Sequence, residues 1–222
     1  MRRAYLGIDL GTSGVKVVLL DQSGNTLART SHGYPVTHPT TGVAESDPVH
    51  WWQATGAAVH DATRRAGEVT IAGIGVDGQM HGLVLTDEQG TALRPAITWA
   101  DTRAAVQAER WHNLPATARP QLANPVVPGM TGPLLAWLLD HEPRTVDRAP
   151  AVLLAKDWLR NAPYWRPRQR PIRRIRHLAL GHHRRHLGRQ HHRRPRAPQH
   201  LCVPRISSAA VTSRVARLVV WP

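Results

Sequence analysis

YLGIDLGTSGVKVVLLD, residues 5–21, is the stretch that decides the fold. Its first part, Tyr5–Asp9, is apolar and ends in a carboxylate, and Val15–Leu20 is a second apolar run broken by a single lysine. A polar turn that contains Gly11 and Gly14 joins the two runs. Two apolar runs around a short glycine-containing turn predict a β-hairpin, and glycine lets the backbone of such a turn approach a ligand closely.

The turn of this hairpin carries groups that suit a phosphate. Successive backbone N–H groups in a tight turn form a concavity for anionic oxygens. The hydroxyls of Thr12 and Ser13 add hydrogen-bond donors, and Lys16 adds a cation. Asp9, at the end of the strand, has the oxygen ligands that a hydrated divalent metal prefers. A polar turn without a ligand is an equally good interpretation of these residues alone, and the P-loop pattern is absent.

Charge divides the 222 residues into two unequal parts. Residues 1–160 hold all 15 acidic side chains and 14 Lys and Arg, so this part is close to neutral. Residues 161–222 hold 15 Arg and no acidic residue, together with many Pro and His. Such a segment cannot bury a hydrophobic core, so the sequence predicts disorder there.

The single cysteine, Cys202, excludes an internal disulfide and fits a reducing compartment. The residues between Arg3 and Asp9 are too few for the apolar region of a signal peptide, and no apolar run approaches transmembrane length. We therefore expect a cytoplasmic protein.

Further along the chain, the pattern predicts alternating strands and helices. Thr26–Tyr34 is expected to add a third, antiparallel strand. Asp47 and Pro48 begin a helix that continues to about Ala66 and ends at Gly67, and Val69–Val76 follows as a buried strand parallel to the first. The expected apolar stripe of the helix is Trp52, Ala58, Val59 and Ala62. Shorter elements are expected at Leu83–Leu85, from Asp101 or Thr102 as helix cap to His112, at Leu134–His141, at Ala151–Leu154 and from Lys156.

The loop 77–82 lies at the carboxyl end of that parallel strand, where open α/β sheets bind ligands. Gln79 and His81 can donate hydrogen bonds to hydroxyl groups and accept them, and Met80 can pack against a carbon skeleton. Taken alone, these residues are more typical of a structural polar loop than of a binding site.

Two other groups of polar residues have competing interpretations. Asp101 and Arg103 could bind a polyol, or they could be a helix cap and a surface charge. The histidines from His182 to His192 have neither cysteine nor acidic partners, so we expect no metal site there.

The motifs together resemble one family. Residues 5–16 closely resemble the opening of the sugar kinases of the FGGY carbohydrate kinase family, and Glu45–Pro48 and Trp51–Gln53 are similar to that family too. Four motifs resemble its xylulokinases in particular: Gln79–Gly82, Pro95–Arg103, Pro128–Thr131 and Lys156–Arg160. The resemblance, continuous over residues 4–160, implies an α/β fold: the ribonuclease H-like, sugar-binding amino-terminal domain of an actin-like ATPase.

The resemblance also implies a reaction and a site. The reaction is phosphoryl transfer from MgATP to the 5-hydroxyl of D-xylulose, which demands positioning and charge neutralisation. Asp9 would be the acid on the metal and phosphate side, with Mg²⁺ bound through water. The other implied residues are Gly11, Thr12 and Ser13 on the nucleotide phosphate with Lys16 nearby, Met80 and His81 on the pentulose, and Gln79, Trp99, Asp101 and Arg103 in the same pocket. A homo-oligomer remains open.

The chain departs from the family after Arg160. The family continues through acidic segments to a catalytic Asp, whereas this chain has no Asp or Glu after Asp157. An abrupt change to Arg, Pro and His is typical of a GC-rich coding region read out of frame. We interpret residues 1–160 as an incomplete kinase domain, residues 161–222 as a frameshifted tail, and the chain alone as inactive. The alternative is a nucleic-acid-binding protein whose Arg-rich tail contacts phosphates.

Overall fold

The computed structural model describes residues 2–113 and 126–162. Of the basic segment 161–222, for which the sequence predicts disorder and a frameshift, residues 163–222 lie outside these residues, as do its histidines. The boundary at residue 161 needs a correction, because Asn161 is helical and Ala162 is buried in the core.

A four-stranded sheet in the order β3-β2-β1-β5 forms the centre of the fold. The predicted hairpin is β1 (Arg2–Leu10) and β2 (Gly14–Asp21), and β3 (Thr26–Gly33) extends it as the expected antiparallel strand. β5 (Val69–Gly78) pairs with β1 in parallel, as the sequence predicts. Alternate residues of β1 are buried, so one face of the sheet is apolar and needs a cover.

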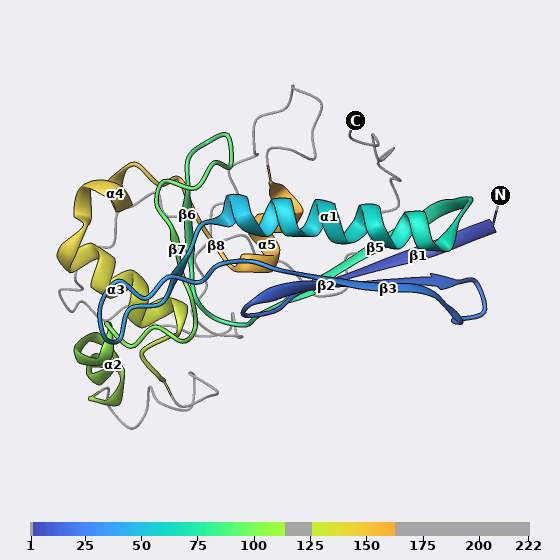
Figure 1. The fold of residues 1–222 in the computed structure, drawn as a ribbon. Coiled ribbons are helices and arrows are strands. Elements are labelled where there is room, and N and C mark those ends of the chain that lie inside the picture. The colour runs from blue at the N-terminus through green and yellow to red at the C-terminus, as the bar shows by residue number, and fades with distance from the viewer. Residues whose placement is uncertain (1, 114–125, 163–222) are drawn as a thin grey trace, which may run out of the picture.

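Helix α1 (Pro48–Ala66) provides that cover, and Figure 1 shows it running along one face of the sheet. The carboxylate of Asp47 caps the helix by accepting the N–H of Val49, with proline in the first turn, as predicted. The expected stripe needs one correction, because Trp51 is buried in the core whereas Trp52 is only half-buried.

The expectation that β5 is a buried strand is wrong. None of its residues is fully buried. The reason is its position: among the described strands β5 pairs only with β1, so it forms an edge of the sheet.

A second part of the fold, drawn at the left of Figure 1, has its own hydrophobic core. Leu83, Leu85, Ile97, Leu134 and Leu138 are among the residues buried there. Its elements are β4 (Glu45–Ser46) paired with β7 (Ala96–Ile97), β6 (Val84–Thr86) paired with β8 (Ala151–Leu153), α2 (Ala105–His112), α3 (Thr131–His141) and α4 (Pro143–Asp147). The last helix, α5 (Ala155–Asn161), packs instead against α1, where Trp158 contacts Trp51 edge to face.

Several boundaries in this second part differ from the expectation. Helix α2 begins at Ala105, and no side chain caps it, so neither Asp101 nor Thr102 is the helix cap. Helix α3 begins at Thr131 instead of Leu134. The short elements β4 and α4 were not expected, because a two-residue strand and a five-residue helix leave no periodic pattern.

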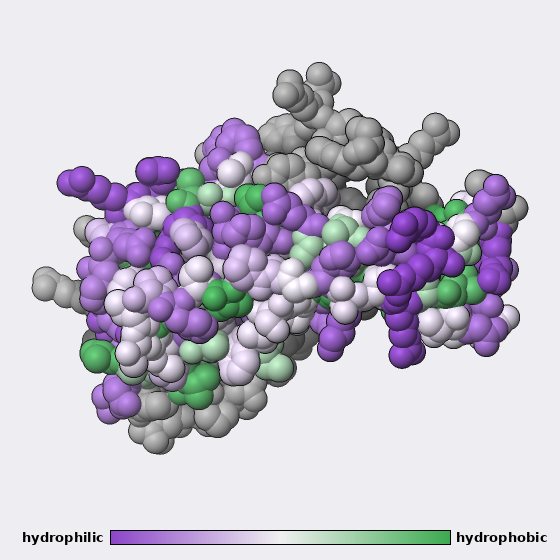
Figure 2. Space-filling view, viewed as in Figure 1, coloured by the Kyte–Doolittle hydropathy of each residue, from purple (hydrophilic) through white to green (hydrophobic). Residues whose placement is uncertain are grey.

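The face drawn in Figure 2 is largely hydrophilic, with apolar side chains in small separate patches. Within residues 2–113 and 126–162, no helix has both the length and the apolar character needed to cross a membrane.

Candidate functional site

Two loops meet at the carboxyl ends of β1 and β5. Leu10 and Gly78 are the last residues of these strands and lie opposite each other in the parallel register. The N–H of Gln79 donates to the carbonyl of Leu10 at 2.7 Å, so the loop after β5 starts beside the hairpin turn. The turn 11–14, which is predicted to bind phosphate (the phosphate turn), and the loop 79–82, which is predicted to bind a sugar (the sugar loop), are therefore neighbours.

Tyr34 holds the hairpin turn in shape. Its N–H donates to the carbonyl of Ser13 at 3.1 Å, and its hydroxyl donates to the carbonyl of Gly11. Burial, reinforced by the negative charge of Asp9, raises the pKa of Tyr34 well above its usual value. The phenol therefore stays protonated and keeps donating. Thr12 and Ser13, in the middle of the turn, are exposed.

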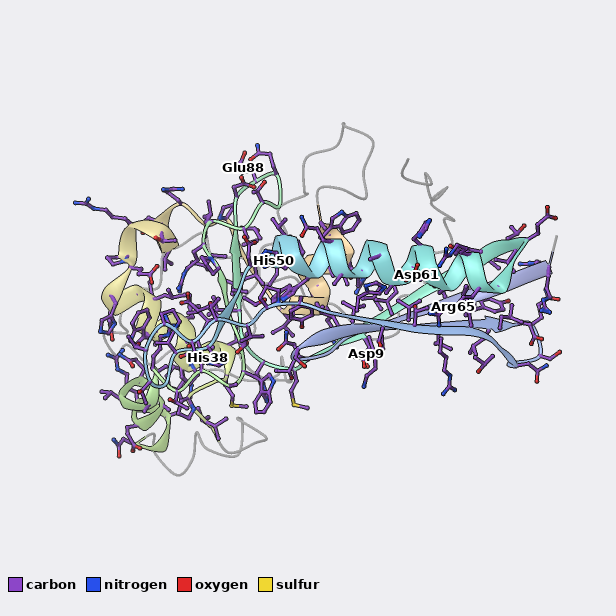
Figure 3. The ribbon with its side chains drawn as sticks, viewed as in Figure 1. Asp9, His38, His50, Asp61, Arg65 and Glu88 are labelled. Carbon is purple, nitrogen blue, oxygen red and sulfur yellow. The ribbon has the colours of Figure 1, made fainter. Side chains whose placement is uncertain are left out.

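Charged side chains stand at the same level on three adjacent strands. Asp9 is opposite Lys16 on β2 and opposite Asp77 on β5, and all three are exposed. Figure 3 shows Asp9 extending from the sheet on the side away from α1. Lys156 Nζ lies 3.5 Å from Asp77 Oδ1. The pKa of Asp77 is lowered mainly by the hydrogen bond that its carboxylate accepts from the N–H of Gly78, and further by the positive charge of Lys156. The described residues include no group of three or more His, Cys, Asp or Glu that could hold a metal ion.

The ion pair of Asp77 and Lys156, which borders this site, was not among the predictions from the sequence. The signal for Asp77 was its position directly before the sugar loop, at a strand end. The signal for Lys156 is weaker, because only packing of α5 brings it to β5.

The sugar loop has an unusual backbone. His81 and Gly82 have φ values of 59° and 64°. Among the described residues, His81 is the one non-glycine residue with a positive φ. The turn is fixed from the far side, since the N–H of Gly82 donates to Gly129 at 3.1 Å and the hydroxyl of Thr131 donates to Gly82 at 2.8 Å. Such backbone conformations persist only where the surroundings enforce them.

A narrow pocket, too tight to admit a water molecule, lies beside this loop and is lined in part by Gln79, His81, Trp51 and Thr98. Both polar atoms of the Gln79 side chain are buried, and neither has a hydrogen-bond partner among the described residues. A buried amide without partners costs free energy, so this side chain is suited to a polar guest. Met80 is 69 % exposed and does not line this pocket.

Trp99 contacts the hairpin turn. It is 48 % exposed, and its indole N–H donates to the hydroxyl of Thr12 at 3.0 Å. Behind it, Gly129 packs so closely that a Cβ at this position would lie 1.8 Å from the carbonyl oxygen of Trp99.

Gly129→Ala is expected to destabilise the protein by about 3 kcal/mol, because the new methyl group collides with backbone that cannot swing aside. Gly56→Ala is the matched control. Gly56 lies inside α1 with open space around its Cβ position, so alanine should stabilise by about 0.5–1 kcal/mol. Chemical denaturation followed by tryptophan fluorescence measures both changes. Equal stability of the two variants would contradict the close contact at Trp99.

Asp101 and Arg103 form a buried ion pair. Asp101 is 0 % exposed, and the Arg103 side chain is only 10 % exposed, which rules out the interpretation of Arg103 as a surface charge. Its Oδ2 accepts the N–H of Ala44 at 2.7 Å and Arg103 Nη2 at 2.8 Å, and its Oδ1 accepts Arg103 Nε at 2.9 Å. Glu45 binds Arg103 Nη2 at 2.7 Å and also pairs with Arg94. All of these hydrogen bonds to the Asp101 carboxylate come from groups of the protein itself.

The chain matches the model of the FGGY family of carbohydrate kinases, N-terminal domain, over residues 4–162. The chain belongs to the FGGY carbohydrate kinases. Xylulose kinase of Escherichia coli strain K12 is 40% identical over 156 residues, covering 70% of this chain and 32% of the relative. The chain thus spans about a third of the length of the curated relatives that it matches.

Solved structures of FGGY kinases agree with this assignment. A xyloylose kinase from Brucella ovis superposes with a TM-score of 0.65 at 38% identity, covering 71% of this chain and 33% of that one. Xylulose kinase from Rhodospirillum rubrum superposes with a TM-score of 0.67 at 28% identity, covering 71% and 34%. The expected actin-like ATPase fold of the FGGY kinases is confirmed for the described part of the chain. No finding favours nucleic-acid binding.

Proposed function

We propose that this chain supplies the sugar-binding part of an ATP-dependent xylulose kinase, which transfers phosphate from MgATP to the 5-hydroxyl of D-xylulose. The observation that carries the proposal is the meeting of two loops of different chemistry at one sheet edge. The turn at residues 11–14 offers donors to phosphate, and the loop at residues 79–82 offers donors and acceptors to hydroxyls. Transfer between a triphosphate and a sugar requires these two kinds of group side by side.

The sugar side fits a polyol. Each hydroxyl of a sugar both donates and accepts a hydrogen bond, and the Gln79 amide has an unused donor and an unused acceptor. His81, in the same pocket, adds a further polar contact, while Met80 and the indole face of Trp99 offer apolar surface to carbon atoms. Asp101 and Arg103 act one step back, by holding the segment that carries Trp99.

The phosphate side fits a metal-bound triphosphate. The exposed carboxylate of Asp9 offers oxygen ligands to Mg²⁺ that arrives with ATP, through water because the described residues place no group of three or more ligating side chains around it. The ion supplies charge neutralisation of the phosphates. Thr12 and Ser13 would hold phosphate oxygens through their N–H groups and hydroxyls, and Lys16 would add positive charge at the neighbouring strand. The N–H of Gly11 already donates to the carbonyl of Gly14 at 3.0 Å, so Gly11 would contribute by letting a phosphate approach the backbone closely.

Titration of the ¹⁵N-labelled chain with D-xylulose tests the sugar side directly. We expect saturable shifts of the amide signals of residues 79–82 and of the Trp99 indole. D-xylose, the aldose isomer, is the control and should shift these signals less at equal concentration. Absence of any D-xylulose response in this loop would contradict the proposal.

His81→Ala tests the sugar loop in a catalytic setting. The setting is a chimera in which residues 4–162 replace the matching part of the Escherichia coli relative. Loss of a buried polar contact should lower kcat/KM for D-xylulose by a factor that corresponds to about 1–3 kcal/mol. His60→Ala, at an exposed position of α1, should leave the kinetics unchanged. Unchanged kinetics for both variants would make His81 a purely structural residue.

A further inference from the structure

One hydrogen bond joins the sugar side of the site to the phosphate side. It runs from the indole N–H of Trp99 to the hydroxyl oxygen of Thr12, 87 residues earlier in the chain, over 3.0 Å. Trp99 follows β7 in the second part of the fold, whereas Thr12 lies in the hairpin turn of the central sheet. A change at one loop can therefore reach the other through a single contact.

The chemistry of this bond limits the directions in which the Thr12 hydroxyl can point its proton. An indole N–H can only donate, so the threonine oxygen must accept. A hydroxyl has one proton and two lone pairs, and the indole occupies one of the lone pairs. No group within residues 2–113 and 126–162 accepts the remaining proton. The Thr12 proton is thus directed away from the indole and is available to a ligand.

The indole is well placed to impose this direction. Gly129 packs against the Trp99 carbonyl, and the preceding Thr98 is tied to Ala44 through its N–H at 3.0 Å. These contacts fix the backbone of Trp99 while half of its side chain stays exposed. A sugar that packs on the exposed indole face would restrict the ring further, and with it the Thr12 hydroxyl.

We propose that Trp99 is a positioning residue for the phosphate turn: by donating to Thr12 it turns the threonine proton toward a phosphate oxygen, and so couples sugar binding to phosphate binding. The inference rests on the proposed function, because it assigns the two loops to sugar and phosphate. Thermodynamic linkage makes this effect reciprocal: the factor by which a bound sugar raises the affinity for phosphate is the factor by which bound phosphate raises the affinity for the sugar.

A double-mutant cycle on the 222-residue chain tests the coupling, with inorganic tripolyphosphate as the probe. The affinity is read from the amide signals of residues 11–14, because the 15 Arg of residues 161–222 will also attract a polyanion. Trp99→Phe keeps an aromatic ring and loses the donor, so we expect about three- to tenfold weaker binding at the turn. In a Thr12→Ala background, Trp99→Phe should weaken binding no further, whereas a Thr12→Ser background should retain the effect.

The same factor in both the Thr12 and the Thr12→Ala backgrounds would overturn the proposal, since Trp99 would then act by packing alone. Lack of response of residues 11–14 to tripolyphosphate would also overturn it. Thr12→Val provides a check without any change at Trp99: it should move the Trp99 indole N–H signal of the free chain, and Thr12→Ser should not. D-xylulose binding separates the coupling from the proposed function. If the effects of the Trp99 and Thr12 substitutions on tripolyphosphate affinity are additive in a chain that still binds D-xylulose, only the coupling is rejected.

Discussion

Arg103→Ala is expected to lower the free energy of unfolding by about 3–5 kcal/mol, the cost of leaving a buried charge without its partner. The carboxylate of Asp101 is fully buried and receives most of its charged hydrogen bonds from this one guanidinium. Glu45 would lose a partner at the same time, and the Trp137 ring would lose the cation that lies 4.9 Å from its centre. Urea denaturation, followed by tryptophan fluorescence, measures the change.

Arg110→Ala is the matched control. Arg110 also pairs with an aspartate, Asp140, at 2.6 Å, but both side chains are exposed. Exposed pairs contribute about 0–1 kcal/mol, so this variant should remain close to the unaltered chain. If the two arginine variants lose the same stability, the buried ion pair of Asp101 and Arg103 does not hold the segment that carries Trp99.

Asp9→Asn is expected to lower kcat of the chimera at least about tenfold, roughly 1.4 kcal/mol of barrier, while KM for D-xylulose changes little. Asparagine keeps the size of the side chain but cannot supply a charged oxygen to a metal-bound triphosphate. Asp9 lies on the strand that leads into the phosphate turn, and its side chain extends from the face of the sheet away from α1. The assay uses saturating MgATP and D-xylulose, so that a binding defect cannot imitate a loss of rate.

Asp77→Asn is the control for this prediction. Asp77 stands opposite Asp9 on the next strand and is also exposed, yet Lys156 already partners it. Its replacement should leave kcat near that of the unmutated chimera. A normal kcat for Asp9→Asn would make Asp9 a turn-forming residue whose role asparagine fills equally well. Equal losses for both variants would point to the general charge of this sheet edge instead of a specific metal contact.

Local patterns were sufficient for the central elements. The hairpin follows from two apolar runs around a glycine turn, and α1 follows from its cap at Asp47 and its proline. These features depend on residues only a few positions apart, which a sequence displays directly. The same holds for the order of the two loops at one sheet edge, because parallel neighbouring strands end together.

The short elements and the burial of individual residues could not be predicted reliably from the sequence. Periodicity placed Trp52 in the stripe of α1 together with Ala58, Val59 and Ala62, whereas Trp51 is the tryptophan that packs in the core, against Trp158. Likewise, a strand of apolar residues was taken to be buried, whereas pairing with a single described strand leaves β5 half-exposed. Both results depend on which neighbour covers a face, and a single segment does not contain that information.

The sequence by itself determined the sheet order around the first hairpin, the family of the chain and the positions of the two loops that we propose to face a ligand. Only the tertiary structure decided which partners the polar side chains near those loops meet. Asp101 meets Ala44 from 57 residues away, and Trp99 meets Thr12 from 87 residues away. The buried state of one carboxylate and the direction of one hydroxyl arise from these distant contacts, because burial and hydrogen bonding depend on packing in space and not on spacing along the chain.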